Sequence, residues 1–381
     1  MASPDHDPAE LQRLTRQYRD YARHEMMSHG SPIYSAICSG LAGDPQTGSL
    51  ALFARPGFGT PLILLAAVHH LLLDGVGHPL GAYYPSVAGE AARPIDDGLY
   101  PAFADLVATH RAAVEDLVAS RTTQTNEAGR AVIVVPALGL IAAASDAPIA
   151  LLEVGASAGL NLNLDRFGYV IGGRATGDPA SPVQIRAEVR GELAPPVPAA
   201  VPRPSWRAGL DLSPLDVRDP ATVGWLRALV WPEHVDRMAI LDAAVGVAHA
   251  HPPRLVRGDL VDDLPALAGQ APSGSPLVVT DTWVLAYVEP ARRRAFVAGL
   301  GALAAARGAP VWLVSCESEE VLASLEVGLG QAPADDSGGL STLSLHRFAP
   351  GRQATHRLLA TCHAHGRWLR WLEAASAAGP A

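Results

Sequence analysis

The sequence IALLEVGASAG, residues 149–159, decides the fold of this 381-residue chain. Its first six residues are apolar apart from Glu153, as expected for a short strand buried in a parallel sheet. The GASAG segment at 155–159 then places two glycines at a strand-to-helix turn, where glycine permits backbone dihedrals that other residues avoid. The amide groups and partial positive charge at the start of the next helix favour a ligand there. The stretch therefore predicts a strand, a ligand-binding loop and a helix that runs to about Phe167.

The chain before and after this stretch follows two different patterns. Up to about residue 145, apolar residues recur at helical spacing, and several segments begin with Asp-Pro, Ser-Pro or Thr-Pro, which are common helix starts. From Ala147 onward, short apolar runs alternate with helical patterns, which is typical of a parallel sheet covered on both faces. We therefore expect a helical domain over 1–145 and an α/β domain over 146–381.

The expected helices span 9–27, 31–41, 60–75, 101–120 and 291–306. The expected parallel strands span 149–154, 255–258, 277–280 and 311–315. Residues 340–348 and 355–363 flank a Pro-Gly turn and predict an antiparallel hairpin added to the sheet. A polar, Pro-rich stretch at 169–204 contains one alternating run at 183–189, and we interpret it as an insertion.

The residues of the loop fit one known cofactor motif. They follow the pattern E-x-G-x-S-x-G, which matches the first motif of S-adenosylmethionine-dependent methyltransferases apart from its middle residue, where glycine is more common. A carboxylate at the end of the strand can meet the amine or hydroxyl groups of a cofactor. We therefore predict that Glu153, Gly155, Ala156, Ser157 and Gly159 bind S-adenosylmethionine. A glycine-rich turn of this kind can also be purely structural.

Acidic residues end the later predicted strands. Asp211, in the segment GLD, ends the second strand and is predicted to bind ribose hydroxyls; Asp259 follows the third and is predicted to meet the adenine amine. Asp281 ends the fourth strand, and together with Trp283 it is predicted to line the methyl-acceptor site as a catalytic residue. This order agrees with the rule that ligands bind at the carboxyl edge of an α/β sheet. Each aspartate alone could equally be a helix cap or a turn residue.

Five segments of the chain resemble a bacterial family of uncharacterised proteins, the domain of unknown function 2332. The segments are QTNEAGRAVIVVPAL (124–138), LLEVGASAGLNLNLDRFGY (151–169), GLDLSPLDV (209–217), ALVWPEHVDRMAILDAA (228–244) and VVTDTWVLAY (278–287). The resemblance implies a methyltransferase-like fold and no established reaction. Two features depart from a standard methyltransferase: the long distance from Gly159 to Asp211, and Ser157 in place of glycine.

The fold class that we predict is α/β. It is a Rossmann-like, class I methyltransferase-type sheet with a C-terminal antiparallel hairpin, preceded by an N-terminal helical domain that acts as a lid or substrate domain. The expected function is transfer of the methyl group of S-adenosylmethionine to a small molecule, which depends mainly on positioning the acceptor. A base is needed only if the acceptor must lose a proton.

Two other functions fit the same loop. The segment also matches G-x-S-x-G, the nucleophile elbow of serine hydrolases, with Ser157 as nucleophile. Asp281 and one of His346, His356 or His363 would then complete the order Ser, Asp, His. The helical pattern before the loop and the position of Glu153 disfavour this alternative. A protein that binds the cofactor without catalysis, as a sensor or scaffold, is the third possibility.

Composition limits the partners of the chain. The formal net charge is −9 and the basic residues are scattered, so the footprint that nucleic-acid binding needs is not visible and a small-molecule substrate is expected. Cys38, Cys316 and Cys362 are far apart and form no CxxC pair, which predicts no disulfide framework, no metal site and a reducing cytoplasm. The apolar stretches are too short to span a membrane. The sequence does not predict an oligomeric state.

Overall fold

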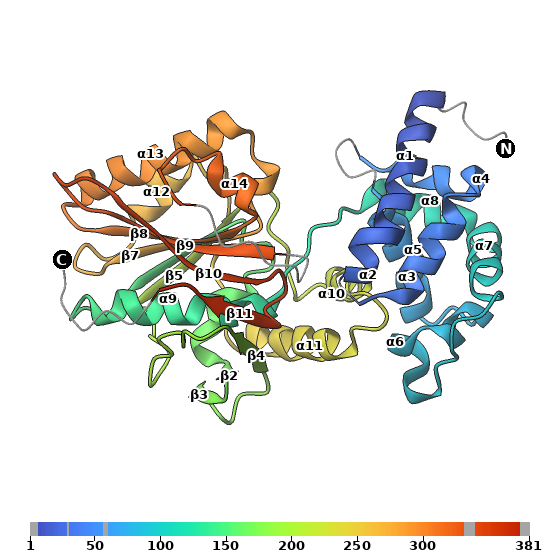
Figure 1. Ribbon diagram of the computed structural model, residues 1–381, viewed down its shortest axis with the longest axis horizontal. Helices are drawn as coiled ribbons and strands as arrows, with labels where there is room; N and C mark the ends of the chain where they lie inside the picture. Colours follow the sequence, from blue (N-terminus) through green and yellow to red (C-terminus); the bar gives the residue numbers. More distant parts are fainter. Residues whose placement is uncertain (1–6, 29, 56–59, 331–339, 374–381) are drawn as a thin grey trace. The chain divides into compact units, whose positions relative to one another are not determined.

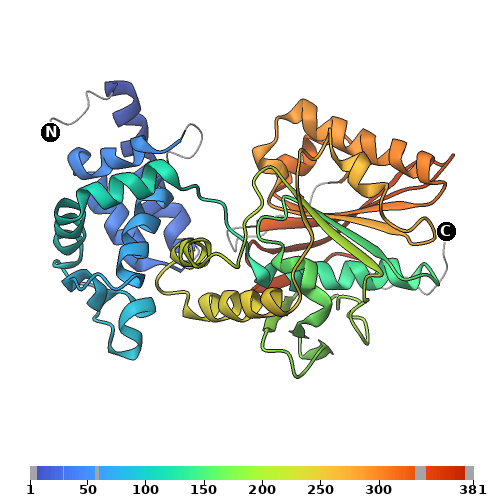
Figure 2. The same cartoon turned by 180° about the vertical axis from the view of Figure 1, so that it is seen from behind.

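The structure is a computed structural model that describes residues 7–28, 30–55, 60–330 and 340–373 (Figures 1 and 2). The chain divides into two compact units, which we describe separately. The helical unit comprises 1–125 and 218–239, and the sheet unit comprises 126–217 and 240–381. Relative to the boundary expected near residue 145, the segment from Asn126 therefore belongs to the sheet unit, and 218–239 returns to the helical unit.

The helical unit is built around one helix that is apolar on all sides. This helix, α5 (Pro61–Leu73), packs against α8 and α10 and buries residues around its whole circumference, such as Ile63, Leu65 and Val68. Helix starts follow the sequence signals: Asp7 accepts a hydrogen bond from the amide of Ala9 at 3.0 Å, with proline at the first helical position. The α-helices of the unit are α1 (Pro8–Asp20), α2 (Met26–Ser28), α3 (Pro32–Leu41), α4 (Pro45–Gly48), α5, α6 (Pro85–Ala88), α7 (Leu99–Thr109), α8 (Arg111–Ser120) and α10 (Pro220–Ala228). Shorter helical turns are η1 (Tyr21–Glu25), η2 (Ser49–Phe53), η3 (Pro79–Tyr83) and η4 (Gly89–Ala91).

Two predicted helices are interrupted. The helix expected over 101–120 is two helices, because His110 leaves the helical conformation at φ −110° and ψ 26°. The helix expected over 9–27 contains the π-helical turn η1, which separates α1 from α2. The predicted helices at 31–41 and 60–75 are confirmed within a few residues.

The sheet unit contains one mixed sheet, in which the structure describes eleven strands. The order across the sheet is β3-β2-β4-β11-β10-β9-β8-β7-β1-β5-β6. The strands are β1 (Ala150–Val154), β2 (Gly168–Ile171), β3 (Arg174–Gly177), β4 (Gln184–Arg190), β5 (Trp206–Asp211), β6 (Leu255–Arg257), β7 (Leu277–Thr282), β8 (Val311–Glu317), β9 (Leu340–Phe348), β10 (Thr355–His363) and β11 (Trp368–Trp371). Strands β6, β5, β1, β7 and β8 are all parallel, with β1 between β5 and β7.

The C-terminal strands complete the sheet. The predicted antiparallel hairpin is confirmed as β9 and β10, which continue the sheet beyond β8. The predicted insertion is more than a loop, because β2, β3 and β4 form the far edge of the sheet and β4 pairs in parallel with β11. The chain is therefore an α/β protein with N-terminal helices and a mixed, mostly parallel sheet that has antiparallel C-terminal strands.

Helices cover both faces of this sheet (Figure 1). On one face lies α9 (Ala131–Ala143), which packs against β4, β8 and β9 and contains Pro136. The other face carries α12 (Leu264–Ala268), α13 (Pro290–Arg307) and α14 (Glu319–Ala323) over a core with Leu152, Val279 and Leu313. Helix α11 (Val235–Ala250) precedes β6. In the described residues, no helix is long and apolar enough to cross a membrane.

Candidate functional site

The GASAG loop follows β1, and contacts with neighbouring residues fix its backbone conformation. Gly155, Ser157 and Gly159 all have positive φ, at 63°, 53° and 70°. A Cβ on Gly155 would lie 2.3 Å from a methyl carbon of Val284, so only glycine fits this left-handed position. Ser157 is a non-glycine residue in the same region, and such strain clusters at functional sites. The loop leads into η6 (Leu160–Arg166), so the helix expected up to about Phe167 is present as a 3-10 helix.

Three buried polar atoms around this loop have no hydrogen-bond partner within the described part of the chain. They are Oε2 of Glu153, Oγ of Ser157 and Oδ1 of Asn161, and these side chains are only 5%, 3% and 9% exposed. A buried polar atom without a partner costs about 1–3 kcal/mol, so each such atom in a native protein needs an explanation. A ligand that donates hydrogen bonds to this loop would supply the missing partners.

The amide groups of the loop, by contrast, are largely used by the protein. The amide of Ser157 donates to Oδ2 of Asp211 at 2.8 Å, and the amide of Leu160 donates to Oδ1 of Asn126 at 3.0 Å. The amide of Gly159 donates to the carbonyl of Ala156 at 2.6 Å. The loop therefore offers oxygen acceptors to a ligand, unlike a phosphate-binding loop, which offers amide donors.

Glu153 is buried at the end of the central strand. Burial raises the pKa of its carboxyl group to about 8, and the charge of Asp211 adds to this shift. A hydrogen bond from Asn161 and the charge of Arg130 act in the opposite direction. Glu153 is therefore mostly protonated at neutral pH, and a cation placed beside it would favour loss of that proton.

Asp211 ends β5, as predicted, and holds the loop in place. Its carboxylate accepts hydrogen bonds from the amides of Ser157 and of Ser213, the latter at 2.7 Å. Gly209 on the same strand permits the close approach, because a Cβ there would lie 2.5 Å from Cβ of Ala156. The predicted contact of Asp211 with ribose remains a prediction.

Asp259 lies beyond β6 in a turn. Its Oδ1 accepts hydrogen bonds from the amides of Val261 and Asp262, and it forms an ion pair with Arg292 at 2.6 Å. Although partial burial opposes the shift, these hydrogen bonds and the charge of Arg292 lower the pKa of Asp259. The contacts are those of a turn residue, and its predicted role with adenine is untested.

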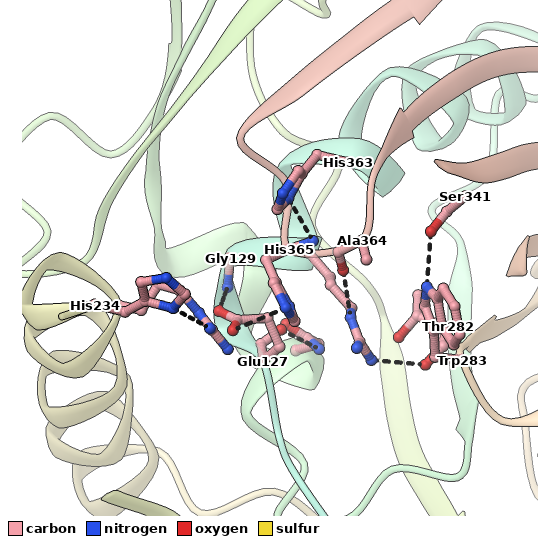
Figure 3. A network of polar contacts seen from close by, with 12 residues as sticks. Glu127, Gly129, His234, Thr282, Trp283, Ser341, His363, Ala364 and His365 are labelled. Atoms are coloured by element: carbon pink, nitrogen blue, oxygen red, sulfur yellow. Dashed lines mark hydrogen bonds and ion pairs between the residues drawn. The ribbon is translucent and has the colours of Figure 1, made fainter. Parts of the chain in front are cut away.

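Asp281 and Trp283 lie at the carboxyl end of β7, next to β1. Asp281 is completely buried and accepts a hydrogen bond from Oγ of Ser315 at 2.9 Å. Trp283 has φ +60°, which is unusual for a bulky residue. Its amide donates a hydrogen bond to the carbonyl of Cys316 at 3.0 Å. Its ring nitrogen donates to Oγ of Ser341 at 2.7 Å (Figure 3). The structure thus brings a second strained residue to the same edge of the sheet as Ser157.

A polar turn before α9 contacts the turn between β10 and β11. Glu127 accepts a hydrogen bond from the amide of Gly129 at 3.1 Å and lies 3.6 Å from Nδ1 of His365 (Figure 3). Arg130 donates to the carbonyl of Ala364 at 2.9 Å and to that of Thr282 at 3.0 Å. The guanidinium of Arg130 therefore ties α9 to β7 and to the C-terminal strands.

The contacts of a serine hydrolase are not assembled in the described residues. Oγ of Ser157 has no hydrogen-bond partner there, whereas His346 contacts Ser344 at 2.9 Å and His356 at 2.8 Å. Nδ1 of His363 accepts a hydrogen bond from the amide of His365 at 3.1 Å. None of these contacts links a histidine to Ser157 or to Asp281.

A family model described as "Uncharacterized protein conserved in bacteria (DUF2332)" matches residues 15–371. The chain belongs to this family. The match includes parts of both units, so the DUF2332 family combines the helical segments with the sheet. A comparison with curated proteins finds no match. Since neither the fold nor the family description specifies a reaction, the function has to be argued from the site.

Proposed function

We propose that this DUF2332 protein binds S-adenosylmethionine at the GASAG loop and transfers its methyl group to a small molecule. The single observation that carries the proposal is the set of buried oxygens without hydrogen-bond partners at the loop, on Glu153, Ser157 and Asn161. S-adenosylmethionine carries an ammonium group and a sulfonium, and a site that is rich in oxygen acceptors suits such a cation.

The order of the parallel strands supports a ligand at this place. Strands β6, β5, β1, β7 and β8 follow one another across the sheet, and with β2–β4 left out they are the third, second, first, fourth and fifth along the chain. This is the order of doubly wound nucleotide-binding sheets, which bind ligands where the order reverses, at the carboxyl ends of the first and fourth strands. The GASAG loop follows β1, and Trp283 follows β7.

The engaged amides favour this cofactor over one held by phosphate groups. A dinucleotide needs loop amides for its pyrophosphate, but those of Ser157, Gly159 and Leu160 already donate to protein oxygens. In the proposed reaction the cofactor supplies an electrophilic methyl group, and the protein positions cofactor and acceptor and excludes water. Glu153, Ser157 and Asn161 would hold the cofactor, while Trp283 would face the acceptor.

Calorimetric titration with S-adenosylmethionine tests the proposal. The wild type is expected to bind, and Gly155→Ala to lose binding, because the added Cβ collides with Val284 and the backbone is left-handed. Gly308→Ala is the matched control: Gly308 has a similar φ of +62°, but nothing lies within 4 Å of its Cβ position. Folded wild-type protein that does not bind would contradict the proposal. Binding without turnover of any acceptor in a metabolite panel would favour a sensor.

The hydrolase alternative has its own test. The left-handed backbone of Ser157, at φ +53°, is the one observation that favours it, since a nucleophile elbow is a strained turn. A fluorophosphonate probe would label Ser157 in a hydrolase. We expect no labelling, because no base contacts its hydroxyl in the described residues.

A further inference from the structure

A pair of buried carboxyl groups lies behind the Trp283 segment. Asp281 at the end of β7 and Glu317 at the end of β8 are both completely buried. They approach each other because β7 and β8 are parallel neighbours in which Asp281 pairs with Ser315 and Thr282 with Cys316. The sequence gives no sign of this contact, since the two residues are separated by the whole of α13.

Each carboxyl group uses one oxygen for a protein donor. Oε1 of Glu317 accepts hydrogen bonds from the amides of Val284 and Leu285, the two residues that follow Trp283, at 2.5 and 2.7 Å. Oδ1 of Asp281 accepts the hydroxyl of Ser315. The remaining oxygens, Oδ2 of Asp281 and Oε2 of Glu317, receive no N–H or O–H donor among the described residues. Because Asp281 pairs with Ser315, the side chains of Asp281 and Glu317 lie on the same face of neighbouring strands. Two buried carboxyl oxygens can bond to each other only with a proton between them.

The surroundings decide which residue carries that proton. Glu317 accepts two backbone amides and lies in the field of Arg130, and both stabilise its carboxylate. Burial and the negative charge of Glu317 raise the pKa of Asp281 far above its ordinary value. Burial also raises the pKa of Glu317, but the amides, Asp281 and Arg130 oppose that shift. Asp281 is therefore the acid and Glu317 the acceptor.

We infer that Glu317 is a positioning residue, which as a carboxylate proton-bonded to Asp281 holds the Trp283 segment in its left-handed conformation. Trp283 itself is fixed by Cys316 and Ser341, so that contacts hold both the strained residue and the two residues after it. The role of this segment at an acceptor site rests on the proposed function. The proton shared by Asp281 and Glu317, and its effect on the segment, are independent of the proposed function.

Two substitutions, each of which replaces a carboxyl group by the corresponding amide, test the inference. Asparagine at 281 copies a protonated aspartate, since it donates to Glu317 and accepts from Ser315, so Asp281→Asn should leave the segment in place. Glu317→Gln removes the negative charge of the side chain that accepts hydrogen bonds from the amides of Val284 and Leu285, and it places a side-chain amide group next to Asp281. Hydrogen exchange of the amides of Val284 and Leu285 should be about tenfold faster in Glu317→Gln and within about twofold of wild type in Asp281→Asn. Equal effects, or a larger effect of Asp281→Asn, would overturn the inference.

Infrared spectroscopy of the wild type provides a test that does not depend on the variants. At neutral pH the wild type should show the carbonyl band of a protonated carboxylic acid. Labelling aspartate with ¹³C should shift this band, and the band should be absent from Asp281→Asn. Absence of a label-sensitive acid band in the wild type would overturn the inference. Cofactor affinity is measured on the same samples: a wild type that fails to bind S-adenosylmethionine contradicts the proposed function, while the exchange and infrared results still decide the role of Glu317.

Discussion

Glu153 lowers the stability of the fold in a way that a binding role would explain. A carboxyl group that is buried without a full set of partners is costly, and such groups are found mainly at functional sites. Its pKa of about 8 lies above the value of about 4.3 of an unfolded glutamate. The stability associated with its protonated form is therefore fully present below about pH 4.3 and is lost as the pH rises through 8, where the cost of burying the carboxylate is largest.

Glu153→Gln should remove this pH dependence, because glutamine resembles the protonated acid. We expect the wild type to lose about 3 kcal/mol in its free energy of unfolding, relative to Glu153→Gln, when the pH rises from 5 to 8. Urea titrations at several pH values measure it. A difference that stays constant with pH would show that Glu153 is not protonated in the native protein.

The sequence identifies some site residues and misses others for physical reasons. Glu153 and the glycines are recognisable because their positions follow from one strand and one turn. Asn161 lies in a 3-10 helix, and a pattern based on α-helical spacing does not predict that it faces Glu153. Glu317 reaches Asp281 through strand pairing, which residue spacing along the chain does not contain.

At the scale of elements, the start of η6 depends on a residue that precedes α9. Oδ1 of Asn126 accepts the amide of Leu160, as a helix cap would. Asn126→Ala should lower the stability of the sheet unit by about 1 kcal/mol and weaken cofactor binding by loosening the loop. Asn126→Asp keeps an acceptor and is the control. Thermal unfolding that is equal in both variants would contradict this role.

The elements that the sequence predicts well are those with strong local signals. Proline starts mark α3 and α5, and two long apolar runs around a Pro-Gly turn mark β9 and β10 at their observed ends. Strands β2, β3 and β11 were not predicted, since each has four residues and is stabilised by neighbours distant in sequence. The break at His110 has no proline or glycine to mark it.

At the scale of the whole molecule, each unit contains a buried histidine whose contribution to stability is lost in acid. Burial lowers the pKa of His69 in the helical unit to about 4 and that of His346 in the sheet unit to about 3. Since unfolded histidine titrates near 6.5, this stability is present above that pH and is lost as the pH falls towards the folded values. Calorimetry at pH 7 and pH 5 should show a loss of about 2 kcal/mol from His69 in the helical unit, whereas in the sheet unit the gain at Glu153 opposes the loss at His346.

His69→Gln separates the two units in this measurement. It should reduce the acid sensitivity of the helical unit and leave the pH dependence of the sheet unit unchanged. An unaltered pH dependence in this variant would contradict the assignment of a buried neutral ring to His69, which contacts the carbonyl of Ala228 and Oγ of Ser86.

The central claim is that the GASAG loop binds a cationic cofactor beside Glu153, whose carboxyl group is protonated before binding, and proton release on binding tests it most directly. S-adenosylmethionine is titrated into the protein at pH 7 in two buffers that differ in ionisation enthalpy. We predict binding with release of about one proton in the wild type, because a cation next to Glu153 lowers its pKa, and no release in Glu153→Gln. The absence of binding to folded protein, or equal proton release in both proteins, would contradict it.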